Sequence, residues 1–114
     1  MAVGEDDLAL QADLRRILQA AGNPISYGAL ARDLRVPAPG AIGRVTSALE
    51  ATMRADAAAG RPFLAAMSKG KVTDGMPARG FFMMAATLGR YSGPATGPEA
   101  VSFVMKERAL LGPK

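Results

Sequence analysis

The segment Ile25–Ala31 reads Ile-Ser-Tyr-Gly-Ala-Leu-Ala, has a helical pattern on either side, and constrains this chain more than any other feature. The hydroxyl of Ser26 can accept hydrogen bonds from the free N–H groups of a first helical turn, so the segment predicts a helix that begins after Ser26. Ile25 and Leu30 have the spacing of a hydrophobic staple across such a cap. The apolar pattern stops before residues 35–40, where two prolines and a glycine break it. A short capped helix followed by a sharp turn is therefore expected.

Longer amphipathic patterns flank this short helix. Apolar residues recur at three- and four-residue spacing over residues 5–21 and again over residues 39–59. The apolar residues of the second pattern share one face: Ile42, Val45, Leu49 and Met53. Gly60 suits the C-terminal cap of that helix. A long helix, a short helix, a tight break and a second long helix form the outline of a helix-turn-helix.

The pattern changes after Gly60. Residues 61–67 form a short apolar run that predicts a strand, and the polar, basic and glycine-bearing residues 68–75 are typical of a hairpin tip. Residues 81–88 fit a strand or a helix, and their one-sided apolar spacing favours a short helix. A last helix is predicted over residues 98–110. Two sets of side chains compete for its buried side: Val101, Val104 and Leu111, or Ala100, Phe103 and Leu110.

These elements predict one mostly helical α+β domain over residues 1–114. Its core, about residues 5–80, is expected to be a winged helix-turn-helix with three helices and a short β-hairpin wing. Residues from about 81 to 112 are expected to add one or two C-terminal helices. The hydrophobic content of 49% is too high for a largely disordered chain, and the length suits a single modest core.

The composition excludes several kinds of chemistry. The chain has no cysteine and no histidine, which removes disulfides, thiolate zinc sites, cysteine nucleophiles and the commonest general base. We therefore expect no enzyme activity, no metal and no cofactor. No apolar run approaches the ~18 residues that a membrane span needs, and the acidic N-terminus is unlike a signal or transit peptide. A cytoplasmic location away from membranes is expected.

The net charge of +4 is unevenly distributed. Residues 61–97 carry five basic side chains against one acidic side chain, whereas residues 1–22 are net acidic. A basic region of this kind can attract and hold a polyanion, although a solvated basic surface would give the same pattern.

The third helix and the hairpin supply the candidate nucleic-acid contacts. In a winged helix-turn-helix the third helix enters the major groove, and basic side chains of the wing contact phosphates. The candidate residues are Tyr27 and Arg35 beside the turn, Arg44, Ser47 and Arg54 on the third helix, and Lys69, Lys71 and Arg79 in and after the hairpin. Duplex DNA is the favoured partner. The alternative is a protein-interaction or oligomerisation module on the same scaffold, with a second copy of the chain as a candidate partner.

Two aromatic residues next to the basic region allow two interpretations. Phe81 and Phe82 follow Arg79 and Gly80, so their rings could stack on unpaired bases. A small domain with so few aromatic residues must bury most of them, so a role in the core is favoured.

Two short motifs carry a resemblance to known families. The order of elements over residues 8–88 resembles the winged-helix superfamily. The sequences Ser26–Ala31 and Tyr91–Gly93 are similar to elements in the DNA-binding domain of the DNA alkyltransferases and alkyltransferase-like proteins. This resemblance implies a DNA-type scaffold with Tyr27 near a phosphate of the target nucleotide. The family's Pro-Cys-His-Arg active site is absent, and Gly40 stands where the family inserts an arginine into the duplex, so alkyl transfer is not implied.

Overall fold

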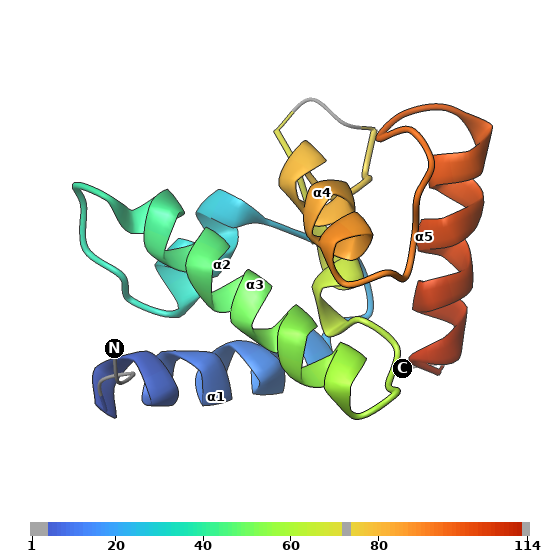
Figure 1. The fold of residues 1–114 in the computed structure, drawn as a ribbon. Coiled ribbons are helices and arrows are strands. Elements are labelled where there is room, and N and C mark those ends of the chain that lie inside the picture. Colours follow the sequence, from blue (N-terminus) through green and yellow to red (C-terminus); the bar gives the residue numbers. More distant parts are fainter. Residues whose placement is uncertain (1–4, 72–73, 113–114) are drawn as a thin grey trace.

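The computed structural model describes residues 5–71 and 74–112, with side chains from Leu8 onward (Figure 1). The described residues form five α-helices: α1 (Glu5–Ala20), α2 (Tyr27–Asp33), α3 (Ala41–Ala58), α4 (Arg79–Thr87) and α5 (Pro98–Leu110). They also form two short strands, β1 (Ile25–Ser26) and β2 (Ser68–Lys69), and a 3-10 helix, η1 (Leu64–Met67). The predicted helices are confirmed within one or two residues at each end, and so is the mostly helical α+β class.

The two strands pair in parallel, with Ile25 opposite Ser68 and Ser26 opposite Lys69. The predicted strand over residues 61–67 is wrong, because η1 occupies the end of that run and β2 begins only at Ser68. All four residues of η1 are buried, and a short, wholly buried apolar run has no periodicity that distinguishes a strand from a helical turn.

The segment after β2 was expected to be the tip of a β-hairpin wing. The Gly70 N–H donates to the Met76 carbonyl at 2.9 Å, which brings the two ends of this segment together. Within the described residues no antiparallel strand pair follows, and Val72 and Thr73 of the expected tip lie outside them. The strand next to β2 is therefore β1, which lies more than 40 residues earlier in the chain.

The start of α2 confirms the predicted cap. Ser26 has an extended backbone and its Oγ accepts a hydrogen bond from the Ala29 N–H at 3.1 Å. Ser26 is thus both the last residue of β1 and the N-cap of α2. After α2 the chain turns through Arg35 (φ 57°) and Gly40 (φ 84°), both left-handed, and enters α3.

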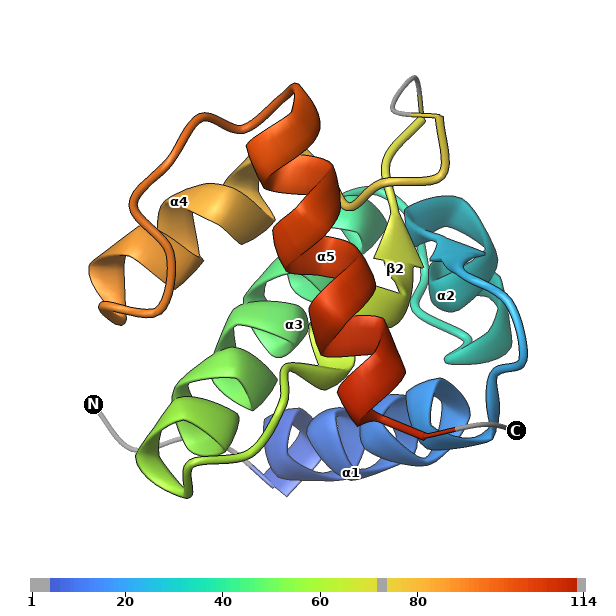
Figure 2. The same cartoon turned by 90° about the vertical axis from the view of Figure 1, so that its right-hand side faces the viewer.

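The hydrophobic core is built around α3 and η1. The helices α1 and α2 pack on α3, and η1 contacts α1, α3 and α5. Figure 2 shows α5 crossing the face of the molecule that holds β2, above α1. The rings of Phe63 and Phe81 meet edge to face with centroids 5.9 Å apart, and Phe82 is also buried, so the core interpretation of Phe81 and Phe82 is confirmed.

The buried side of α5 mixes the two predicted sets. Ala100 and Val104 are buried, whereas Val101 and Leu110 are exposed. None of the helices in the described part of the chain is long and apolar enough to cross a membrane.

A carboxylate on α3 joins this helix to α1 and to the segment that leads into η1. Asp56 is fully buried, and its Oδ1 accepts from the guanidinium groups of Arg15 (3.0 Å) and Arg61 (3.1 Å). Its Oδ2 accepts from the Leu64 N–H at 3.1 Å. The charge of Asp56 is therefore compensated inside the core, as a buried carboxylate requires.

Arginines on and near α5 are also occupied by structural contacts. The Arg90 Nη2 donates to Glu107 Oε1 at 2.7 Å, and its guanidinium lies 4.2 Å from the centre of the Phe63 ring. Arg108 donates to the carbonyls of Ala66 (2.8 Å) and Gly75 (2.7 Å), and burial lowers the pKa of its guanidinium. These arginines tie α5 to the rest of the fold.

Candidate nucleic-acid interface

The outer face of α3 brings together the three residues predicted on the third helix. Arg44, Ser47 and Arg54 are all exposed, and they line one shallow hollow of about 590 Å³ with Leu10 and Gln11 of α1. Their spacing places them on the side of the helix opposite its buried residues. At 1.5 Å per residue, Arg44 and Arg54 are separated by roughly 15 Å along the helix.

The two arginines on this outer face differ from the arginines that pair with buried carboxylates. Arg15, Arg61 and Arg90 each form an ion pair with a buried carboxylate. Arg44 and Arg54 form no ion pair with any residue whose side chain the structure describes. Their charges are therefore available to an external anion.

The other predicted basic residues lie in separate places. Arg35 is exposed in the loop between α2 and α3, and Lys69 is half-buried in β2. Lys71 is exposed and lines a cavity beside α2, whereas Arg79 begins α4 and lines a different hollow with Asp74 and Ala95. The structure thus gathers the predicted residues of α3 but does not collect the basic residues of the expected wing beside them.

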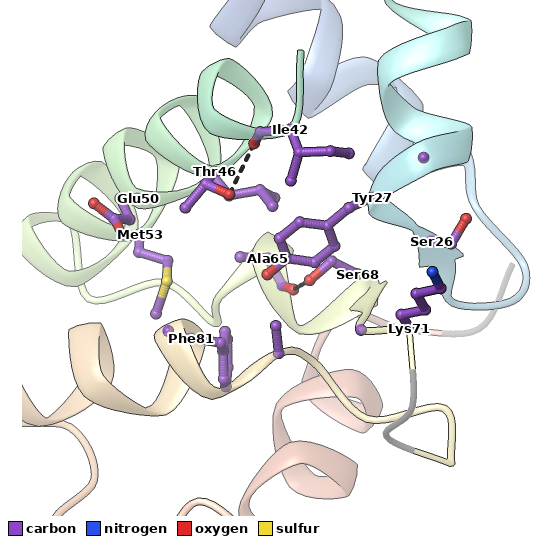
Figure 3. A pocket seen from close by; sticks show the side chains of 15 residues that line it. Ser26, Tyr27, Ile42, Thr46, Glu50, Met53, Ala65, Ser68, Lys71 and Phe81 are labelled. Carbon is purple, nitrogen blue, oxygen red and sulfur yellow. Dashed lines mark hydrogen bonds between the residues drawn. The ribbon is translucent and has the colours of Figure 1, made fainter. Parts of the chain in front are cut away.

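A larger cavity, of about 750 Å³, lies on the other flank of α3 (Figure 3). Its walls come from the start of α2, one side of α3, η1, the segment after β2 and the start of α4. Most of the lining is apolar or small, and the labelled lining residues are Ser26, Tyr27, Ile42, Thr46, Glu50, Met53, Ala65, Ser68, Lys71 and Phe81. This cavity was not predicted, because its residues come from five segments that the sequence does not show to be neighbours.

Tyr27 lies inside this cavity, with its ring between α3 and β2 (Figure 3). Burial raises the pKa of its hydroxyl, and the negative charge of Glu50 acts in the same direction. Hydrogen bonds to the Ser68 side chain and to the Ala78 backbone oppose this increase without cancelling it. Tyr27 is therefore a neutral phenol at physiological pH.

One residue expected in the core lies instead at the edge of the cavity. Ile42 was placed on the apolar face of the third helix, but 49% of its surface is exposed, and it lines the cavity together with Thr46 and Met53. Sequence reasoning missed this flank of α3: Ile42 and Thr46 lie between the buried and the outer faces of the helix, next to the buried Met53.

The described residues include no group of three or more acidic side chains that could hold a metal ion. Comparison with known protein families, with curated protein sequences and with solved structures finds no match to this chain. The functional argument therefore depends on the geometry of α3 and its surroundings.

Proposed function

We propose that this protein binds nucleic acid, with duplex DNA the favoured form, through the outer face of α3 and without catalysis. The observation that supports this proposal most directly is the pair of exposed arginines, Arg44 and Arg54, which have no ion-pair partner among the described side chains. Arginine forms bidentate hydrogen bonds with phosphate and with guanine, and the Ser47 hydroxyl between the two arginines can donate or accept.

The shape of α3 also supports the proposal. The helix has 18 residues, and the hollow along its outer face is lined mainly by α3 itself, with Leu10 and Gln11 contributed by α1. A helix of this width fits the major groove, which is roughly 12 Å wide. The resemblance of Ser26–Ala31 to an element of DNA alkyltransferases favours duplex DNA over RNA.

Basic residues outside α3 have a secondary role in this proposal. Arg35 lies beside the turn into α3, Lys69 lies in β2, Lys71 lines the larger cavity, and Arg79 lines a separate hollow. We expect these four residues and Tyr27 to contact the sugar-phosphate backbone, if the nucleic acid extends beyond α3. Such contacts contribute to affinity rather than to sequence preference.

The proposal is tested by titrating labelled duplex and single-stranded DNA at several salt concentrations. Arg44→Ala and Arg54→Ala should each weaken binding and reduce the slope of log K against log salt by about 1. Lys106→Ala is the matched control, since Lys106 is an exposed cation on α5 and is not among the residues that line the hollow with Arg44 and Arg54. Binding that is undetectable at low salt, independent of salt, or equally weakened by Lys106→Ala would overturn the proposal.

One surface favours the alternative, an oligomerisation module. Val101 and Met105 are exposed apolar residues four positions apart on α5, and each borders a shallow hollow. Exposed apolar residues that cluster on one helix are typical of interaction surfaces. Light scattering of the free protein tests this alternative: a strict monomer at high concentration contradicts it, and a dimer that Met105→Lys dissociates supports it.

A further inference from the structure

The cavity between α2, α3, β2 and α4 has the properties of a small-molecule site. Its volume of about 750 Å³ lies within the range of roughly 300–1,000 Å³ that is typical of ligand pockets. Apolar side chains form most of its lining, and a few polar groups converge on it. The rings of Tyr27 and Phe81 lie on two of its sides (Figure 3).

Two helical glycines are among the residues that line the cavity. Gly28 of α2 and Gly80 of α4 both line the cavity, and a Cβ added to either glycine would meet no atom within 4 Å. Both glycines lie in helices and have no positive φ, so neither is required by the backbone conformation. Each glycine is the second residue of its helix, and both leave the adjoining part of the cavity free of a side chain.

Two opposite charges line the cavity at separate ends. Figure 3 shows Lys71 on the side of Ser26 and Glu50 on the far side of the Tyr27 ring. Neither charge forms an ion pair with another residue whose side chain the structure describes. The site is thus an apolar, partly aromatic space with a cation at one end and an anion at the other.

We infer that this cavity binds a free, planar aromatic molecule that carries an anionic group at one end and a hydrogen-bond donor or cation at the other. The aromatic body packs against Tyr27 and Phe81, the anionic group faces Lys71, and the donor faces Glu50. This orientation is the one that satisfies both charges. The inference does not depend on the outer face of α3, because Ile42, Thr46 and Met53 line the cavity on a different flank of the helix from Arg44 and Arg54. Tyr27 and Lys71 are the two residues that both proposals use.

The probe 6-amino-2-naphthoate has the required shape and groups, and its fluorescence can be followed directly because the chain has no tryptophan. Saturable binding with one site per chain is expected. 2-Naphthoate, which lacks the donor, should bind about threefold more weakly. Lys71→Gln should weaken the binding of 6-amino-2-naphthoate by about threefold, as expected when a solvent-accessible ion pair is lost. Glu50→Gln should remove the preference for the amino compound.

Two substitutions on adjacent residues of α3 separate this site from the nucleic-acid face. Thr46→Phe fills the cavity and should weaken the probe more than tenfold while DNA binding persists. Ser47→Phe adds the same bulk to the outer face and should have the opposite pattern. Circular dichroism and Tm establish that both variants fold, and Lys71→Gln tests the site without added bulk. No saturable binding, equal binding by the Thr46→Phe and wild-type proteins, or no preference between the two naphthoates would overturn the inference.

Discussion

Glu107 on α5 accepts a hydrogen bond from the backbone N–H of Phe63 at 3.2 Å, although 44 residues separate the two in sequence. The same carboxylate oxygen accepts from Arg90 at 2.7 Å, and only 4% of the surface of Glu107 is exposed. This one side chain therefore fixes α5 to the segment that enters η1.

Replacement of Glu107 by alanine should destabilise the protein strongly. The change leaves the buried Phe63 N–H and the Arg90 Nη2 without the Glu107 acceptor, and removing one partner of a largely buried pair costs about 3 kcal/mol. Urea denaturation followed by circular dichroism measures the change in free energy of unfolding. Lys106→Ala, at the exposed neighbouring position, should change it by less than about 0.5 kcal/mol. Equal stability of the two variants would contradict the structural role of Glu107.

The cap of α2 predicts a smaller effect. Ser26→Ala removes the acceptor of the Ala29 N–H and should reduce the free energy of unfolding by about 1 kcal/mol. Ser102→Ala, at an exposed position inside α5, is the control, and it should be neutral or slightly stabilising. A Ser26→Ala protein as stable as the wild type would show that β1 alone fixes the start of α2.

Arginines that pair with a buried carboxylate should affect stability, whereas arginines on the outer face of α3 should affect DNA binding. Arg61→Ala removes a donor to the buried Asp56 and should lower stability by about 1 kcal/mol, with the salt dependence of DNA binding unchanged. Arg54→Ala should leave stability within about 0.5 kcal/mol and reduce the salt slope. Thermal denaturation and DNA titration of both variants check this. A variant that lost both stability and the salt dependence of DNA binding would contradict this division between structural and binding arginines.

The pKa of Tyr27 predicts how stability changes in alkali. Burial raises this pKa in the folded state above its ordinary value of 10.0, so the folded protein holds the phenolic proton more tightly than the unfolded chain. The stability contributed by this proton is fully present below pH 10.0 and is lost as the pH rises through the folded-state pKa. Urea denaturation at pH values below and above 10.0 should show a smaller loss of unfolding free energy in Tyr27→Phe than in the wild type. An identical loss in both would contradict the raised pKa.

The helices could be predicted because each long pattern has an apolar face of its own. The cap at Ser26 was predictable for the same reason: it depends on residues within one turn of each other. The parallel pairing of β1 and β2 was not predictable, since each strand has two residues and its partner lies far away in sequence. A run of two residues shows no alternation from which a strand can be recognised.

The shared face of the three α3 residues could be predicted, whereas the places of the other basic residues and the shape of the surface could not. Arg44, Ser47 and Arg54 share a face because helical spacing alone decides it. Asp56 was not expected to be buried, although it continues the buried positions of Val45, Leu49 and Thr52 at helical spacing. A carboxylate at a core position is an available signal for a buried ion pair. The cavity, in contrast, depends on how five segments pack, and no local pattern contains that information.

The dual position of Ser26 has a consequence for any attempt to shorten this protein. The residue that starts α2 is held by a strand whose partner begins at Ser68, and Asp56 of α3 needs the Leu64 N–H. A fragment that ends at Gly60 would contain all three helices of the first half but would lack both attachments. The outer face of α3 therefore depends on residues as far along the chain as Ser68. The first three helices alone would not form a stable unit that presents this face.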